Sequence, residues 1–198
     1  YFYPPLFTCD TETQKVQTAI YVRSDLSYSQ LNPLPYADNI NDMYATGACV
    51  KFNQQCIINV ISVYFPRGPK DENTDWIKNI NFNNKNWAIM GDFNAHSSLW
   101  EKDCSSTTSN RLVENIVDSP LLLLNDCSIT RVPDSNTQRP TAIDLSLLSA
   151  CLAVDSNWYV VDDCLGSDHL PIIIEINDIT TNEDSKLDDK IPKFCYSR

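Results

Sequence analysis

The chain has 198 residues and a hydrophobic content of 42%, which suffices for one well-buried domain and requires no second core. Its longest apolar runs, such as residues 121–124 and 171–174, are far too short to cross a membrane. The 15 basic and 26 acidic residues give a net charge of −11, which argues against nucleic-acid binding through overall charge and suits a site that collects divalent cations.

The eight cysteines and two histidines bound the metal and redox chemistry. No two cysteines form a CxxC pair, so a structural zinc site is not expected. An even count would allow disulfides, but we favour reduced, partly buried thiols and an intracellular setting. The chain begins at Tyr1 without a methionine and shows no secretory leader or other targeting signal, so we expect a fragment or a processed piece.

The first third of the chain predicts loops and strands. Residues before Gln17 are predicted to be a loop, and residues 18–22 are the first β-prone run. Residues 23–44 are rich in Asn, Ser, Asp and Pro, as in a surface excursion with room for one edge strand. Two apolar segments, 48–52 and 56–64, are separated by a polar turn, which is typical of a hairpin.

Short helices and further strands follow. Residues 71–82 predict a helix with a cap at Asn73 or Thr74 and with Trp76, Ile77 and Ile80 on one face. A second helix is predicted over 111–118, with Asn110 as its cap. Its apolar residues with helical spacing are Leu112, Val113, Ile116 and Val117. Strands are predicted at 87–90, 121–124, 142–148, 158–161 and 170–176, and the acidic, polar residues from 178 to 198 are predicted to be a linker. Many strands with few short helices favour an α/β or α+β sandwich over a helical bundle.

The stretch NWAIMGDFNAHSSLW at residues 86–100 is the centre of the functional argument. Its apolar run stops at Gly91, which favours a strand ending in a tight turn. Asp92, Asn94 and His96 follow, and polar side chains at a strand's carboxyl end are where sheet proteins bind ligands. An ordinary strand-to-loop junction explains the same residues equally well.

Two more polar groups stand out along the chain. Asp144 lies within the apolar run AIDLS, and a buried carboxylate needs a partner; the alternative is a solvent-facing residue on an edge strand. Asp168 and His169 precede the last apolar strand, where an acid can bind a metal and a histidine a phosphate. Taken alone, such a triplet occurs by chance in loops.

The order VYFP, GDFNAH, IDLSLLS, GSDHLPI resembles the endonuclease/exonuclease/phosphatase superfamily, which includes pancreatic deoxyribonuclease, apurinic/apyrimidinic endonucleases, inositol polyphosphate phosphatases and sphingomyelinases. GDFNAHSSLW and the segment IPKF at 191–194 are similar to the endonuclease domains of arthropod non-LTR retrotransposons. The resemblance runs from about Thr18 to Phe194. It implies a four-layer sandwich of two packed mixed β-sheets flanked by helices, here over residues 1–177 and lacking the first strands.

The resemblance also implies Mg²⁺-dependent hydrolysis of phosphodiesters, with Mn²⁺ as a substitute. The expected partners are double-stranded DNA and a covalently linked reverse transcriptase, and no membrane is expected as a partner. The expected location is the nucleus. The resemblance implies that Asp92 binds the metal and activates the attacking water, and that Asn94 fixes that water or the phosphate. His169 and Tyr64 would contact the phosphate. Asp144 would orient His169, and Asp168 would support the metal. Arg67 is either a DNA contact or a solvated loop residue, and His96 and Trp100 are either DNA-facing or structural.

The chain also departs from the family pattern. Family members begin with strands that carry an asparagine and the principal metal-binding glutamate, and we expect this chain to start after both, since neither Asp10 nor Glu12 lies in a matching context. Ser97 replaces a second histidine and Glu101 replaces a glycine. Three hypotheses follow: a nicking endonuclease of a retroelement, a catalytically inactive remnant of one, and a phosphatase or phospholipase of the same fold.

Overall fold

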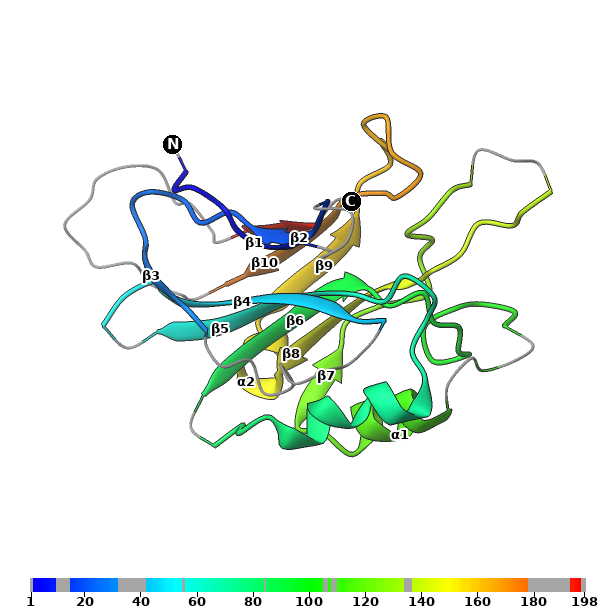
Figure 1. Cartoon of the computed structure of the whole chain (residues 1–198), viewed down its shortest axis with the longest axis horizontal. Helices are drawn as coiled ribbons and strands as arrows, with labels where there is room; N and C mark the ends of the chain where they lie inside the picture. The colour runs from blue at the N-terminus through cyan, green and yellow to red at the C-terminus, as the bar shows by residue number, and fades with distance from the viewer. Residues whose placement is uncertain are drawn as a thin grey trace.

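A mixed sheet of six strands forms the centre of the computed structural model (Figure 1), which describes residues 2–9, 15–31, 42–54, 56–83, 85–104, 107, 110–133, 137–177 and 193–196. Its strand order is β3 (Ser27–Gln30), β4 (Tyr44–Lys51), β5 (Ile57–Tyr64), β6 (Asn86–Asp92), β8 (Asp144–Ser149), β7 (Leu121–Leu123). The dense Ile and Val content of β5 fits its place in the interior of this sheet.

Strand pairing brings the predicted functional residues together. β5 and β6 are parallel, and the register sets Tyr64 opposite Asp92. β6 and β8 are antiparallel, and Asp92 lies opposite Asp144. The end of β5, the end of β6 and the start of β8 therefore meet at one edge of the sheet.

A second, smaller layer covers one face of the six-stranded sheet. It comprises the antiparallel strands β9 (Ser156–Val160), β10 (Ile172–Ile176) and β11 (Lys193–Tyr196), and the hairpin of β1 (Leu6–Cys9) and β2 (Val16–Ile20). The core between these layers includes Val60, Met90 and Ile174, together with Leu152 from the short helix α2 (Ala150–Ala153). Buried and half-buried residues alternate along β10, as expected for a strand with one face on the core.

The opposite face of the six-stranded sheet carries the helical elements η1 (Asp71–Asn73), η2 (Asp75–Asn79) and α1 (Asn110–Val117). Their apolar side chains share a core with Ile61, Ile89 and Leu145 of the sheet. Within the described residues the fold is thus two packed β-layers, the smaller one made of two sheets, with helices outside the larger one. These are three of the four layers expected. None of the described residues forms a helix that is long and apolar enough to span a membrane.

Most predicted elements are confirmed, and the exceptions among the helices have local causes. The predicted helix over 71–82 is two 3₁₀ turns, because Asn73 accepts a hydrogen bond from the Lys70 amide (2.7 Å) and Thr74 donates one to the Asp71 carbonyl (3.0 Å); such side-chain bonds compete with a continuous helix. The expected buried face is correct for Trp76 and Ile77, whereas Val117 of the second helix is 66% exposed.

Both ends of the chain contain strands that the sequence did not predict. The expected opening loop includes β1, where Thr8 Oγ1 donates to the Ala45 carbonyl at 2.7 Å and so ties the hairpin to β4. At the other end, β11 pairs with β10, so residues 193–196 join a sheet and are not linker. These strands are held by pairing with their neighbours β2 and β10, and their local pattern did not predict it. Residues 178–192 lie outside the described residues, and the linker prediction is untested there.

Candidate active site

Gly91 sets the geometry of the strand that delivers Asp92. A Cβ atom at this position would lie 1.8 Å from the Val63 carbonyl oxygen of β5, and the φ angle is +154°. Only glycine allows two backbones to approach this closely. The next residue, Asp92, is completely buried at the end of β6.

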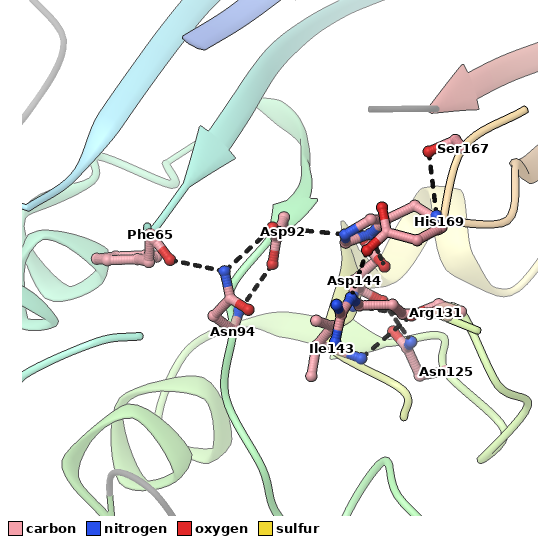
Figure 2. A network of polar contacts seen from close by, with 11 residues as sticks. Phe65, Asp92, Asn94, Asn125, Arg131, Ile143, Asp144, Ser167 and His169 are labelled. Carbon is pink, nitrogen blue, oxygen red and sulfur yellow. Dashed lines mark hydrogen bonds and ion pairs between the residues drawn. The ribbon is translucent and has the colours of Figure 1, made fainter. Parts of the chain in front are cut away.

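Asn94 holds the Asp92 carboxylate in place (Figure 2). The Asn94 amide N–H donates to Asp92 Oδ1 at 3.0 Å, and its side-chain Nδ2 donates to Oδ2 at 3.1 Å and to the Phe65 carbonyl at 2.9 Å. The φ angle of Asn94 is +46°, a left-handed conformation that asparagine tolerates well. The Gly-Asp-Phe-Asn motif is thus both a turn and a carboxylate cradle.

His169 lies between two buried carboxylates. Its Nδ1 is 3.0 and 2.9 Å from the two oxygens of Asp144, and its Nε2 is 3.9 Å from Asp92 Oδ2. Because an ionised carboxylate only accepts hydrogen bonds, Nδ1 carries the proton that it donates to Asp144. Nε2 is buried without a hydrogen-bond partner among the described residues. Asp144, His169 and Asp92 form a row, and the atom of His169 that faces Asp92 is a buried nitrogen whose hydrogen-bonding capacity is unused by the described residues.

The surroundings raise the pKa of His169. Burial favours the neutral ring, but the hydrogen bond from Nδ1 to Asp144 and the charges of Asp144, Asp92 and Asp168 outweigh burial. The pKa of His169 therefore lies above its ordinary value. A ring that holds a second proton presents an Nε2–H donor, which is suited to an anionic oxygen.

The loop before β8 supports Asp144 from behind, through residues that sequence reasoning missed. Thr130 is completely buried, and its Oγ1 accepts the backbone amides of Ile143 (3.1 Å) and Asp144 (3.0 Å). Asn125 Nδ2 donates to the Asp144 carbonyl at 2.8 Å. Thr130 and Asn125 lie in a stretch of polar residues, and no local pattern distinguishes them from other loop residues.

Asp168 lies beside the row, but its carboxylate has a different partner from the one expected. Arg131 Nε donates to Asp168 Oδ2 at 2.9 Å. Burial would raise the pKa of Asp168, yet the hydrogen bond from Arg131 and the charges of His169 and Arg131 hold it below the ordinary value. Asp168 is therefore an ionised side chain in an ion pair, and its predicted metal-supporting role is untested.

Tyr64 is in the expected place. It is 9% exposed, pairs with Asp92 across β5 and β6, and stacks on Tyr44 with ring centroids 6.2 Å apart. The stack fixes the ring beside the Asp92 edge.

The three residues predicted to face DNA have different surroundings. Arg67 is 72% exposed and forms an ion pair with Asp42. His96 Nδ1 lies 2.6 Å from Glu101 Oε2, and its side chain is 36% exposed. Trp100 has no exposed surface, and its Nε1 donates to the Ala95 carbonyl at 3.0 Å. Trp100 is therefore packed in the interior of the domain, and its predicted DNA-facing role is untested.

The donor groups fit a magnesium ion only in part. Among the described residues, no group of three or more His, Cys, Asp or Glu side chains is arranged to hold a metal. Mg²⁺, however, is commonly held by one or two carboxylates with water and substrate phosphate. The buried carboxylate of Asp92, beside an open His169 nitrogen, fits that mode. Asp10 and Glu12 lie outside the described residues.

Comparisons with known proteins identify the family. A family model described as endonuclease-reverse transcriptase matches residues 58–173, a range that includes Tyr64, Asp92, Asp144 and His169. None of the curated proteins matches the chain.

Solved structures share the fold. The endonuclease domain of TRAS1, a telomere-specific non-LTR retrotransposon, aligns with a TM-score of 0.75 and 19% identity over 89% of this chain and 81% of that one. A mannosyl-6-phosphatase of Bacteroides thetaiotaomicron aligns with a TM-score of 0.53 and 13% identity over 89% and 76%. At these identities the likeness establishes the fold alone, and it agrees with the fold that the sequence resemblance implied. The family model covers more than half of the chain, including its four central site residues. The chain therefore belongs to the endonuclease-reverse transcriptase family.

Proposed function

We propose that this protein is a metal-dependent DNA endonuclease that nicks double-stranded DNA in the nucleus for the insertion of a non-LTR retrotransposon. The observation that carries the proposal is the buried row of Asp144, His169 and Asp92, in which His169 Nε2 has no hydrogen-bond partner among the described residues. Hydrolysis of a phosphodiester needs a group that handles water and a donor that meets negative charge on the phosphate. Within this row, Asp92 is the group that handles water and His169 is the donor.

Each side chain has a role that follows from its contacts. Asp92 accepts the proton of the attacking water, and Asn94 keeps that carboxylate oriented through its two hydrogen bonds. His169, with a raised pKa, donates from Nε2 to a phosphate oxygen as charge develops. Asp144 fixes the ring and stabilises its charge, as the buried carboxylate does in a catalytic triad. Tyr64, beside Asp92, contacts the same phosphate.

Mg²⁺, or Mn²⁺ in its place, would be held by Asp92 and would offset the charge of the phosphate. Asp168, whose charge acts on His169, would assist once its bond with Arg131 is exchanged. The family description, which couples an endonuclease to a reverse transcriptase, supports a covalently linked polymerase as the partner in the native element.

Incubation with supercoiled plasmid and Mg²⁺ tests the proposal. We expect nicked circles from the wild-type protein and none from Asp92→Ala, because the carboxylate that handles water is lost. Glu114→Gln, an exposed change on α1, is the matched control and should nick normally. If the wild type does not nick even when extended at its amino end by the glutamate-bearing strands of a relative, the proposal is wrong.

A second candidate is a catalytically inactive domain with a binding role. It is favoured by the absence of a three-residue metal cluster among the described residues. Titration calorimetry with Mg²⁺ separates the two candidates. Tight binding at one site that Asp92→Ala abolishes supports the enzyme, and no binding in the presence of DNA supports the inactive domain.

A further inference from the structure

A buried acid beside the candidate active site holds two exposed basic side chains. The side chain of Asp42 is only 7% exposed and forms ion pairs with Arg67 through Oδ1 and with Lys70 through Oδ2, the latter at 2.8 Å. The two bases are 72% and 54% exposed. The arrangement differs from an ordinary surface ion pair, in which solvent surrounds both partners.

Glu101 repeats the arrangement in another loop. Its side chain is 5% exposed, Oε2 lies 2.6 Å from His96 Nδ1, and Oε1 lies 3.3 Å from Arg139 Nη2. His96 and Arg139 are 36% and 56% exposed. This glutamate stands where the sequence departs from the family motif, so the motif does not account for it.

Both clusters include residues of loops that begin at the edge of the sheet where Asp92 lies. Arg67 and Lys70 follow the end of β5, and His96 and Glu101 follow the end of β6. These strands are parallel neighbours, so their carboxyl ends lie at the same edge. The buried Trp100, bonded to the Ala95 carbonyl, anchors the loop that holds the second cluster.

The burial of the acids argues for a positioning role. A buried carboxylate costs free energy unless cations face it, and here the cations are held in fixed places while their outer surfaces remain in solvent. Arginine presents five N–H donors in a planar fork that matches phosphate oxygens, and each arginine faces its acid through a terminal nitrogen. Because the whole chain has a net charge of −11, an anionic ligand needs such local positive groups.

We propose that Asp42 and Glu101 are positioning residues that hold Lys70 and Arg139, along with Arg67 and His96, as binding points for the backbone phosphates of DNA. The identity of the ligand rests on the proposed function. The two acids hold the basic side chains at the Asp92 edge of the sheet, where a phosphodiester in the site continues into its neighbouring phosphates.

Neutralising the acids separates positioning from simple electrostatics. We expect Asp42→Asn and Glu101→Gln to weaken binding of a labelled short DNA duplex, measured by fluorescence anisotropy without divalent metal, although each change removes a negative charge. The slope of log affinity against log salt should fall by about 1 for each phosphate that the protein no longer neutralises. Glu114→Gln makes the same change of charge on the exposed surface of α1 and should bind as well as wild type or better.

Lys70→Ala and Arg139→Ala provide a second test that keeps both buried acids. Each should weaken binding and lower the salt slope while leaving the far-ultraviolet circular dichroism unchanged. The proposal is overturned if these two variants bind with unchanged affinity and slope, or if folded Asp42→Asn and Glu101→Gln bind like Glu114→Gln. Plasmid nicking, measured in parallel, reports the proposed function separately, because binding can depend on these bases in a protein that does not nick.

Discussion

Two ion pairs of this protein, each formed by an aspartate and a basic side chain, show how burial changes the role of such a pair. At the sheet edge, Asp144 and His169 are almost completely buried and lie 2.9 and 3.0 Å apart through the two carboxylate oxygens and Nδ1. On the helical layer, Asp75 and Arg111 form an ion pair whose side chains are 40% and 46% exposed. The buried pair has an unused nitrogen and lies beside a third charge, whereas the exposed pair only joins η2 to α1. Substitutions should therefore have their largest effects at the buried pair and their smallest at the exposed one.

Asp144→Ala should have the largest effect on stability. It leaves the buried His169 ring without its partner, and loss of one member of a buried ion pair costs about 3 to 5 kcal/mol. Urea denaturation measures the loss. A cost similar to that of an exposed substitution such as Glu114→Ala would show that Asp144 is not a paired, buried group.

Thr130→Val should have the next largest effect. Valine keeps the shape of threonine but removes the acceptor for the backbone amides of Ile143 and Asp144, and buried donors without an acceptor cost about 1 to 3 kcal/mol. Thr107→Val, at an exposed position, is the control in the same urea experiment. Equal midpoints for the two variants would contradict the assigned support of β8.

The row at the sheet edge should lose stability as pH rises. The pKa of His169 is raised in the folded state, so its contribution is complete below the unfolded value of about 6.5 and is lost as pH increases through the folded value. His169→Gln should therefore lower the free energy of unfolding more in mildly acidic than in alkaline buffer, as followed by thermal unfolding. A larger deficit at the higher pH would reverse the sign and refute the assignment.

The stability contributed by the exposed pair of Asp75 and Arg111 should change with pH in the opposite direction. Its effect on the free energy of unfolding should be the smallest of the four. The hydrogen bonds from Arg111 and Asn115 lower the pKa of Asp75 to about 2, so its contribution is present above the unfolded value of about 3.9 and is lost as pH falls toward the folded value. Asp75→Asn should be slightly less stable than wild type at neutral pH, and the difference should shrink in acid. A difference that grows in acid would contradict the lowered pKa.

The sequence predicted which residues meet at this site better than it predicted the residues that support them. Asp92, Asn94 and His169 follow or precede apolar runs, so position relative to a strand and motif order were enough to find them. Asp144 was found because an acid in an apolar strand is costly. Thr130 and Arg131 act by folding back onto β8 and Asp168, and a single sequence does not show which loop residue returns to which strand.

The same limit explains the misses in the fold. β1 and β11 are held by pairing with β2 and β10, while their local pattern resembles loop and linker. Trp100 was open to two interpretations because an aromatic residue after a polar loop packs or binds with equal ease. Its complete burial favours packing.

The rate of plasmid nicking in Mg²⁺ by wild type, Asp92→Asn and His169→Gln tests the central claim most directly. The account predicts that the wild type converts supercoiled to nicked circles and that each variant is slower by about 10² to 10⁴, the usual contribution of a positioned proton-transfer group. Both variants keep nearly the size of the native side chains, so the slower rate reports chemistry. Nicking at the wild-type rate by either variant would contradict the assignment of the buried row as the active site.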